Sequence, residues 1–338
     1  VVLEKGVCHI PDKLAYGCTA LKHVILPDTL KSVGRNAWEY TPFLNNWLEN
    51  RGEDSGRIFW DGRDLEGDVS LPKGTGIVAG GAFYGNHSLM AVHFPGSVTW
   101  VGGAALKGCT SLAHVTWPMA VTTAQPEVFS GCINLETVVS GDDGLETVVS
   151  GADGLETEAQ SESSPVAAVY WKSIKDRAFF GCLKLSSIFW KDIQEIGKEA
   201  FFGCASLIPE KADSLRQVGE GAFEGVGGIG EAAGMSVVGS IIVSGGHCMG
   251  EVCVPEGITA IAPFAFSGNR QITKVVFPET LSYIGEGAFF GCSGLTEIRF
   301  PTALCAIGAR AFEKCTGLQE VCLCADSVGP AAFAYCLS

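Results

Sequence analysis

A phrase of about 23 residues recurs along this chain of 338 residues and constrains the fold more than any single residue does. Its aromatic residue falls at Phe266, Phe289 and Phe312, two steps of 23. The same position is filled elsewhere by Trp38, Phe83, Leu106, Phe129, Phe179, Phe201, Phe223 and Phe333. A fixed period of this length is typical of stacked units that bury their apolar faces against one another. We therefore expect one elongated repeat solenoid.

Each unit reads as a short strand, a corner marked by proline and a second apolar stretch. In the strand that precedes Pro301, Leu295 and Ile298 fit an inward face, whereas Glu297 and Arg299 point outward. This assignment follows from the alternation of side chains along a strand. The stretch Ile-Gly-x-x-Ala-Phe makes the return arm, where small residues permit close packing of successive turns.

Fourteen cysteines invite a disulfide or zinc interpretation. Paired CxxC motifs are absent, and free cysteine packs as a small apolar residue, so we expect a buried ladder of structural thiols. Oxidation of stacked thiols stays an open alternative. Eight cysteines share one position of the repeat, namely Cys18, Cys109, Cys132, Cys182, Cys204, Cys292, Cys315 and Cys336.

Three departures interrupt the period. Two restarts match at an offset of 183, Ile58 to Gly62 and Ile241 to Gly245, and their apolar runs around a glycine turn predict hairpin-like inserts. The third is a tandem duplication that begins at Leu135 and predicts an acidic surface loop after its first copy. We expect one continuous solenoid. Its divisions in chain order are turns at 1–50, an insert and restart at 51–81, turns at 82–134, the acidic insert at 135–165, turns at 166–230, the second insert at 231–258 and the C-terminal turns at 259–338.

Charge and hydropathy exclude several classes of protein. The net charge of −14 disfavours nucleic acid as a partner. The sequence lacks a run of about 18 apolar residues, so we expect no membrane span. It starts at Val1 without a signal-peptide pattern, which predicts a mature or trimmed form.

Metal and cofactor sites are not expected. Gly225 to Gly230 matches the letters of a dinucleotide fingerprint, but it follows a repeat turn rather than a strand, which favours a glycine-rich linker. His93 and His114 fit diagonal positions on the outward side of neighbouring strands. We interpret them as surface residues, because two histidines without a nearby carboxylate make a poor zinc site. No pattern of catalytic residues emerges, so we expect no enzyme.

The phrase Ile-Gly-x-x-Ala-Phe-x-Gly-Cys-x-x-Leu resembles the BspA-like, or treponemal-type, leucine-rich repeat. The resemblance extends from Leu14 to the C-terminus except for the acidic insert. It implies a right-handed superhelix of short parallel strands with little helix, interrupted by inserts. It further implies a bacterial surface, secreted or periplasmic protein. Several members of the family act as adhesins for host or bacterial proteins. The family has no shared catalytic residue to transfer.

Apolar residues occupy outward strand positions that solvent alone would make polar, notably Ile25, Val139, Phe189 and Val276. An exposed apolar surface of more than a few hundred Å² indicates a contact site, although scattered surface hydrophobes are ordinary. With His93, His114, Thr116 and Arg299, these residues form the candidate binding site for an unidentified host or bacterial protein. An apolar pocket for a lipid-like molecule beside the strands and self-association through terminal turns are the alternatives.

Overall fold

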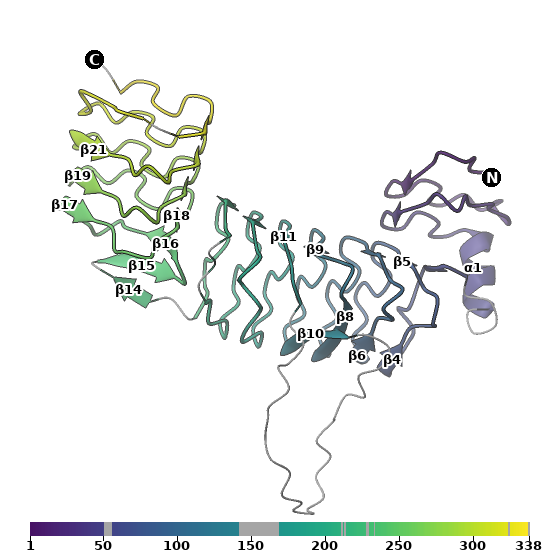
Figure 1. Cartoon of the computed structure of the whole chain (residues 1–338). Coiled ribbons are helices and arrows are strands. Elements are labelled where there is room, and N and C mark those ends of the chain that lie inside the picture. Colours follow the sequence, from purple (N-terminus) through teal and green to yellow (C-terminus); the bar gives the residue numbers. More distant parts are fainter. Residues whose placement is uncertain are drawn as a thin grey trace, which may run out of the picture.

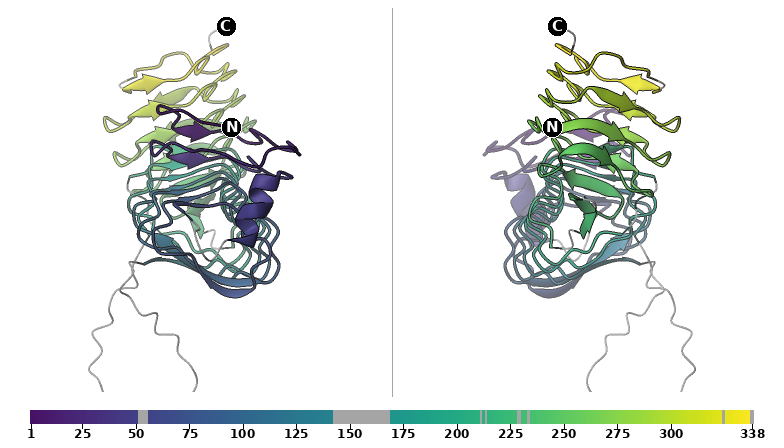
Figure 2. Two further views of the ribbon diagram at one scale, coloured as in Figure 1. Left: turned by 90° about the vertical axis from the view of Figure 1, so that its right-hand side faces the viewer. Right: turned by 90° about the vertical axis from the view of Figure 1, so that its left-hand side faces the viewer.

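The computed structural model describes residues 1–50, 56–141, 169–210, 212, 214–227, 230–232, 234–323 and 325–336. Over these residues the chain winds into a solenoid of about 12 turns, which bends along its length (Figure 1). Views along the solenoid show the turns of its middle part in superposition (Figure 2). The predicted repeat solenoid of short parallel strands with little helix is confirmed.

The longer strands form two parallel sheets. Strand residues one repeat apart are paired, so that His93 lies beside Thr116 and Thr116 beside Val139. The first sheet contains β4 (Gly67–Ser70), β6 (Leu89–His93), β8 (His114–Pro118) and β10 (Thr137–Gly141), and the second contains β17 (Gly250–Cys253), β19 (Ile272–Val276) and β21 (Glu297–Arg299).

Shorter parallel strands form separate ladders along the solenoid. Two of them are β1 (His9–Ile10) with β2 (Ser32–Val33), and β3 (Ile58–Phe59) with β5 (Ile77–Val78) and β7 (Trp100–Val101). A third contains β9 (Thr123–Ala124), β11 (Ser173–Ile174), β12 (Glu195–Ile196) and β13 (Gln217–Val218). The fourth contains β16 (Ile241–Ser244), β18 (Ala260–Ile261), β20 (Tyr283–Ile284), β22 (Ala306–Ile307) and β23 (Ser327–Val328).

The repeated aromatic residue builds stacked columns in the interior. Neighbouring strands of a sheet are about 4.8 Å apart, so equivalent rings of successive turns meet face to face. One column contains Phe129, Phe179, Phe201 and Phe223, with centroid separations of 5.1, 5.4 and 5.8 Å. The other contains Phe266, Phe289, Phe312 and Phe333, with separations of 4.7, 5.0 and 5.1 Å.

The cysteine three residues after this aromatic position joins one turn to the turn before it. The thiol of Cys109 donates to the Phe83 carbonyl over 3.1 Å, and the same bond recurs at Cys132, Cys182, Cys204, Cys292, Cys315 and Cys336. These seven thiols are free and buried, as predicted. The prediction is wrong for Cys18, which is exposed because it lies in the first described turn with no earlier turn beneath it.

The glycine of the Ile-Gly pair is required by a close approach of two backbones. A Cβ atom at Gly285 would lie 2.5 Å from the amide nitrogen of Pro263, and one at Gly308 would lie 2.5 Å from that of Glu286. Both distances are shorter than any ordinary carbon–nitrogen contact. The small residues of the return arm therefore set the spacing of the turns, as expected from the sequence.

The buried side chains form three apolar cores, which divide the solenoid into a first stack (residues 1–50), a middle stack (58–227) and a last stack (235–336). Trp60 and Ile77 of the middle stack pack into the core of the first stack. Ile241 and Ala260 of the last stack likewise pack into the core of the middle stack. We call these two contacts the first and the second junction.

The two inserts differ in structure. The second one is hairpin-like, as predicted, because β14 (Gly230–Ala232) and β15 (Met235–Val238) pair antiparallel and β15 pairs antiparallel with β16. At the first insert the hairpin prediction is wrong for the described residues, which form the parallel strands β3, β4 and β5, while helix α1 (Pro42–Glu49) lies just before the insert. The helix begins there because Thr41 Oγ1 accepts a hydrogen bond from the Leu44 amide and Pro42 occupies the first turn.

The acidic duplication is described only in part. The described part of its first copy contains β10. Residues 142–168, which include the second copy and most of its acidic side chains, lie outside the described residues, as do residues 51–55 of the first insert.

Candidate functional site

Four of the eight predicted site residues lie together on the outward side of the first long-stranded sheet. The pairing places Ser70, His93, Thr116 and Val139 in one row across β4, β6, β8 and β10. His114 lies one row away, opposite Ala91, and is therefore diagonal to His93 as predicted. We call this outward surface the strand face. Of these residues His114 is exposed, and His93, Thr116 and Val139 are half-buried.

Both histidines of the strand face bond to the next turn. His93 Nδ1 lies 2.9 Å from Thr116 Oγ1, and His114 Nδ1 lies 3.0 Å from Thr137 Oγ1. Because each imidazole is held through Nδ1, Nε2 is the nitrogen left to bond a partner. The ladder of hydroxyl and imidazole groups thus presents pre-oriented polar groups beside Val139.

The other predicted site residues lie on separate parts of the solenoid. Phe189 is half-buried and packs edge to face on Tyr170 with centroids 4.9 Å apart. Ile25 is 61% exposed in the first stack, where it forms a β-bridge with Val2. Val276 and Arg299 are paired on the second long-stranded sheet, and Arg299 forms an ion pair of 3.2 Å with Glu297.

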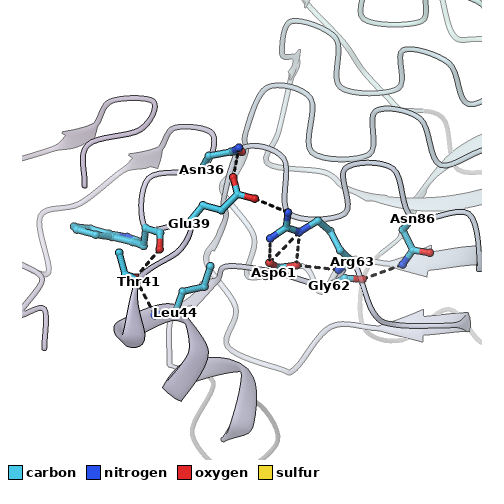
Figure 3. Close-up of polar contacts among 9 residues, drawn as sticks. Asn36, Glu39, Thr41, Leu44, Asp61, Gly62, Arg63 and Asn86 are labelled. Atoms are coloured by element: carbon cyan, nitrogen blue, oxygen red, sulfur yellow. Dashed lines mark hydrogen bonds and ion pairs between the residues drawn. The ribbon is translucent and has the colours of Figure 1, made fainter. Parts of the chain in front are cut away.

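A polar network spans the first junction (Figure 3). Arg63 Nη1 donates to Glu39 over 2.8 Å and Arg63 Nη2 to Asp61 over 2.5 Å. Asn36 donates to the second carboxylate oxygen of Glu39. The side chains of Glu39 and Asp61 are only 11% and 7% exposed. The hydrogen bonds to Asp61 raise the pKa of the Arg63 guanidinium against the opposing effect of partial burial, and the Arg63 side chain stays 41% exposed.

The same corner of the fold encloses very different volumes at the two junctions. At the first, the space between Trp38, Glu39, Trp60 and Asp61 is about 30 Å³, and a neighbouring space of about 450 Å³ lies on the other side of Glu39, Leu44 and Arg63. At the second, the corresponding space is about 420 Å³. It is lined by Ala222, Phe223, Glu224, Ser236, Val243, Ser244 and Phe264, together with neighbouring residues.

The sequence interpretation did not identify these junctions as sites. The signal that could have found them is the offset of 183, at which the bulky pair Trp60 and Arg63 corresponds to Val243 and Gly246. The expected apolar pocket beside the strand face stays a prediction. A cavity of about 300 Å³ beside Leu26, Phe43 and Trp47 also belongs to the first junction.

The described residues hold no cluster of metal ligands, and two thiols of the cysteine ladder are shielded by burial. Within them, no three His, Cys, Asp or Glu residues lie close enough to hold a metal ion. Burial raises the pKa of the Cys182 thiol well above its usual value and that of Cys204 to about 12. Such thiols stay protonated near neutral pH, and the thiolate is the reactive form.

A family model described as BspA type leucine-rich repeat region matches residues 1–49, 58–152, 168–241 and 244–338. These ranges comprise nearly all of the chain. No functionally curated protein matches it. Within the part of the chain that the structure describes, no helix has the length and apolar character needed to cross a membrane.

Several solved bacterial leucine-rich repeat proteins are similar in structure. One from Bacteroides ovatus is 19% identical, with coverage of 80% of this chain and 84% of its own and a TM-score of 0.38. A leucine-rich cell surface protein from Faecalibacterium prausnitzii is 20% identical (coverage 82% and 74%, TM-score 0.33). A leucine-rich repeat protein from T. pallidum is 23% identical (coverage 70% and 82%, TM-score 0.33).

Proposed function

Because this chain belongs to the BspA-type leucine-rich repeat family, we propose that it is a non-enzymatic protein-binding module whose strand face contacts its partner. The observation that supports this most is the row formed by His93, Thr116 and Val139, which the register aligns across three strands. A flat array of residues on rigid strands is a surface that a folded protein can cover.

The chemistry of the strand face fits a protein partner. Val139 supplies apolar area, while His93 and His114 each offer Nε2 beside it. Mixed apolar and hydrogen-bonding surfaces of this kind are usual in protein–protein interfaces. Phe189 extends the apolar part along the middle stack, and Ile25, Val276 and Arg299 supply further contacts on the adjoining stacks.

Family membership also supports a location and a biological role. We propose that the protein acts at the bacterial surface or in the periplasm as an adhesin for a host or bacterial protein. The excess of acidic over basic residues favours a partner with a basic surface.

Lysine substitution at three predicted contact residues, of which Val139 lies on the strand face and Phe189 and Val276 lie beyond it, tests the proposal. In pull-down from host matrix and bacterial surface proteins, Val139→Lys, Phe189→Lys and Val276→Lys together are expected to weaken capture at least about tenfold, because each places a charge in a desolvated contact. Met119→Lys is the control, since Met119 is 53% exposed in the turn after β8. Circular dichroism should be unchanged in both variants. Undiminished capture by the triple variant would refute the role of these predicted contact residues, Val139 of the strand face included.

A further inference from the structure

The two junctions are built from corresponding residues. The restart strands correspond at an offset of 183, which relates Trp60 to Val243, Asp61 to Ser244 and Arg63 to Gly246. The turns on which the restart strands pack also correspond, because Trp38 and Phe223 occupy the same position of the repeat. Glu39 therefore corresponds to Glu224. The linings of the two cavities follow this correspondence almost residue for residue. What fills one junction therefore indicates what fits the other.

At the first junction, side chains of this chain fill the space. The ring of Trp60 is 8% exposed and packs edge to face on Trp38, with centroids 6.1 Å apart. The guanidinium of Arg63 lies between the carboxylates of Glu39 and Asp61. Leu44 of α1 closes the space from the side. The occupants of this corner are thus an aromatic ring and a guanidinium three residues apart.

At the second junction, the described residues leave the corresponding space open. Val243 and Gly246 are too short to fill it, and the cavity of about 420 Å³ has the size of ordinary ligand sites. Glu224, the counterpart of Glu39, is exposed and has no ion-pair partner among the described residues. Glu220, which also lines the cavity, pairs with Lys198 over 2.8 Å.

We propose that the second junction binds a segment of a partner protein through one aromatic side chain and one arginine side chain. The ring takes the place that Trp60 occupies at the first junction and packs against the edge of Phe223. The guanidinium takes the place of Arg63 and donates to the Glu224 carboxylate, with Ser236 and Ser244 as further hydroxyl partners in the lining. This site is separate from the strand face and does not depend on it.

The probe for the test is the blocked peptide acetyl-Trp-Gly-Gly-Arg-amide, which has the spacing of Trp60 and Arg63. Calorimetry with the full chain is expected to detect binding, weakened at least about tenfold by Glu224→Gln, since the charge-assisted bonds are lost. The control Glu256→Gln changes an exposed carboxylate away from the cavity and should bind as the unmodified protein does. No binding by the unmodified protein, or equal binding by Glu224→Gln, would overturn the proposal.

A second variant fills the cavity from within. Val243→Trp with Gly246→Arg introduces the counterparts of Trp60 and Arg63, and a Cβ atom at Gly246 meets nothing within 4 Å. We expect this variant to fold, by circular dichroism, and to lose peptide binding. Retained binding would place the peptide elsewhere and contradict the proposal. The triple lysine variant of Val139, Phe189 and Val276 should still bind the peptide, which separates failure of this site from failure of the proposed function.

Discussion

At the scale of single residues, one position of the repeat meets a different need in each setting. Three residues after the aromatic position, most turns have a cysteine with one hydrogen bond to the preceding turn. The turns that follow the two restarts have Asn86 and Asn269 instead. Asn86 donates to the carbonyls of Gly62 and Leu65 and accepts from the amides of Ser88 and Leu89. The side-chain amide of Asn86 thus bonds both carbonyl and N–H groups of the irregular restart region, which a thiol cannot do.

Substitution of Asn86 is expected to be costly even with the residue that the repeat prefers. Asn86 is 3% exposed, and each buried polar group left unpaired costs about 1–3 kcal/mol, so Asn86→Ala and Asn86→Cys should each destabilise the middle stack by about 3 kcal/mol or more. Asn134→Ala, which loses one bond to the Thr110 carbonyl, should cost about 1 kcal/mol. Urea unfolding followed by tryptophan fluorescence measures this. An Asn86→Cys variant as stable as the unmodified protein would contradict the account.

At this scale the sequence predicted the buried thiols, but neither the role of Asn86 nor the exposure of Cys18. The period alone identified the buried thiols, because a residue that recurs every turn must stack on its equivalents. It could not identify Asn86, because the carbonyls that Asn86 satisfies become unpaired only when the restart loop folds. It could not place Cys18 either, since exposure depends on whether another turn covers the residue.

At the scale of elements, ion pairs connect the first stack to the middle stack. Glu127 accepts from Lys107 over 2.6 Å within the middle stack and from Arg35 over 3.1 Å across the junction. Burial acts to raise the pKa of Glu127, but the Lys107 hydrogen bond and the charges of Lys107, Arg35 and Arg177 lower it below its usual value of 4.5. Glu127 therefore stabilises the folded state as a carboxylate.

This lowered pKa predicts the direction of an effect of acid. A carboxyl group whose pKa is lower in the folded chain contributes stability above about pH 4.5, and the contribution is lost as the pH falls through the lowered value. Glu127→Gln should therefore lower the unfolding temperature at pH 7 and have a smaller effect at pH 3. Glu256→Gln, the control, should change neither. An equal effect of Glu127→Gln at both pH values would show that its ion pairs do not contribute.

For the two junctions, the sequence predicted the restarts but not their packing. The offset of 183 showed that two restarts are alike, but not that each packs on the end of the preceding stack. That contact depends on side chains distant in sequence, such as Tyr283, which packs into the middle core. Thr41 and Pro42 are common helix-start residues, yet the surrounding repeat pattern favoured strands, so α1 was not expected.

At the scale of the whole molecule, the junctions divide what the sequence presented as one array. The outward positions of the strands recur along the whole chain, but in the structure they belong to separate sheets on stacks that point in different directions (Figure 1). His93, His114, Thr116 and Val139 share one surface, whereas Val276 and Arg299 lie on another. A partner that contacts only the strand face of the middle stack would therefore leave Val276 and Arg299 uncovered.

The central claim is that the repeated residues build the frame and that a protein partner covers the strand face of the middle stack. Hydrogen–deuterium exchange of the full chain, with and without the captured partner, tests it most directly. We expect binding to slow amide exchange in β6 (residues 89–93), β8 (114–118) and β10 (137–141). Slowed exchange confined to other parts of the solenoid, with these three strands unchanged, would contradict it.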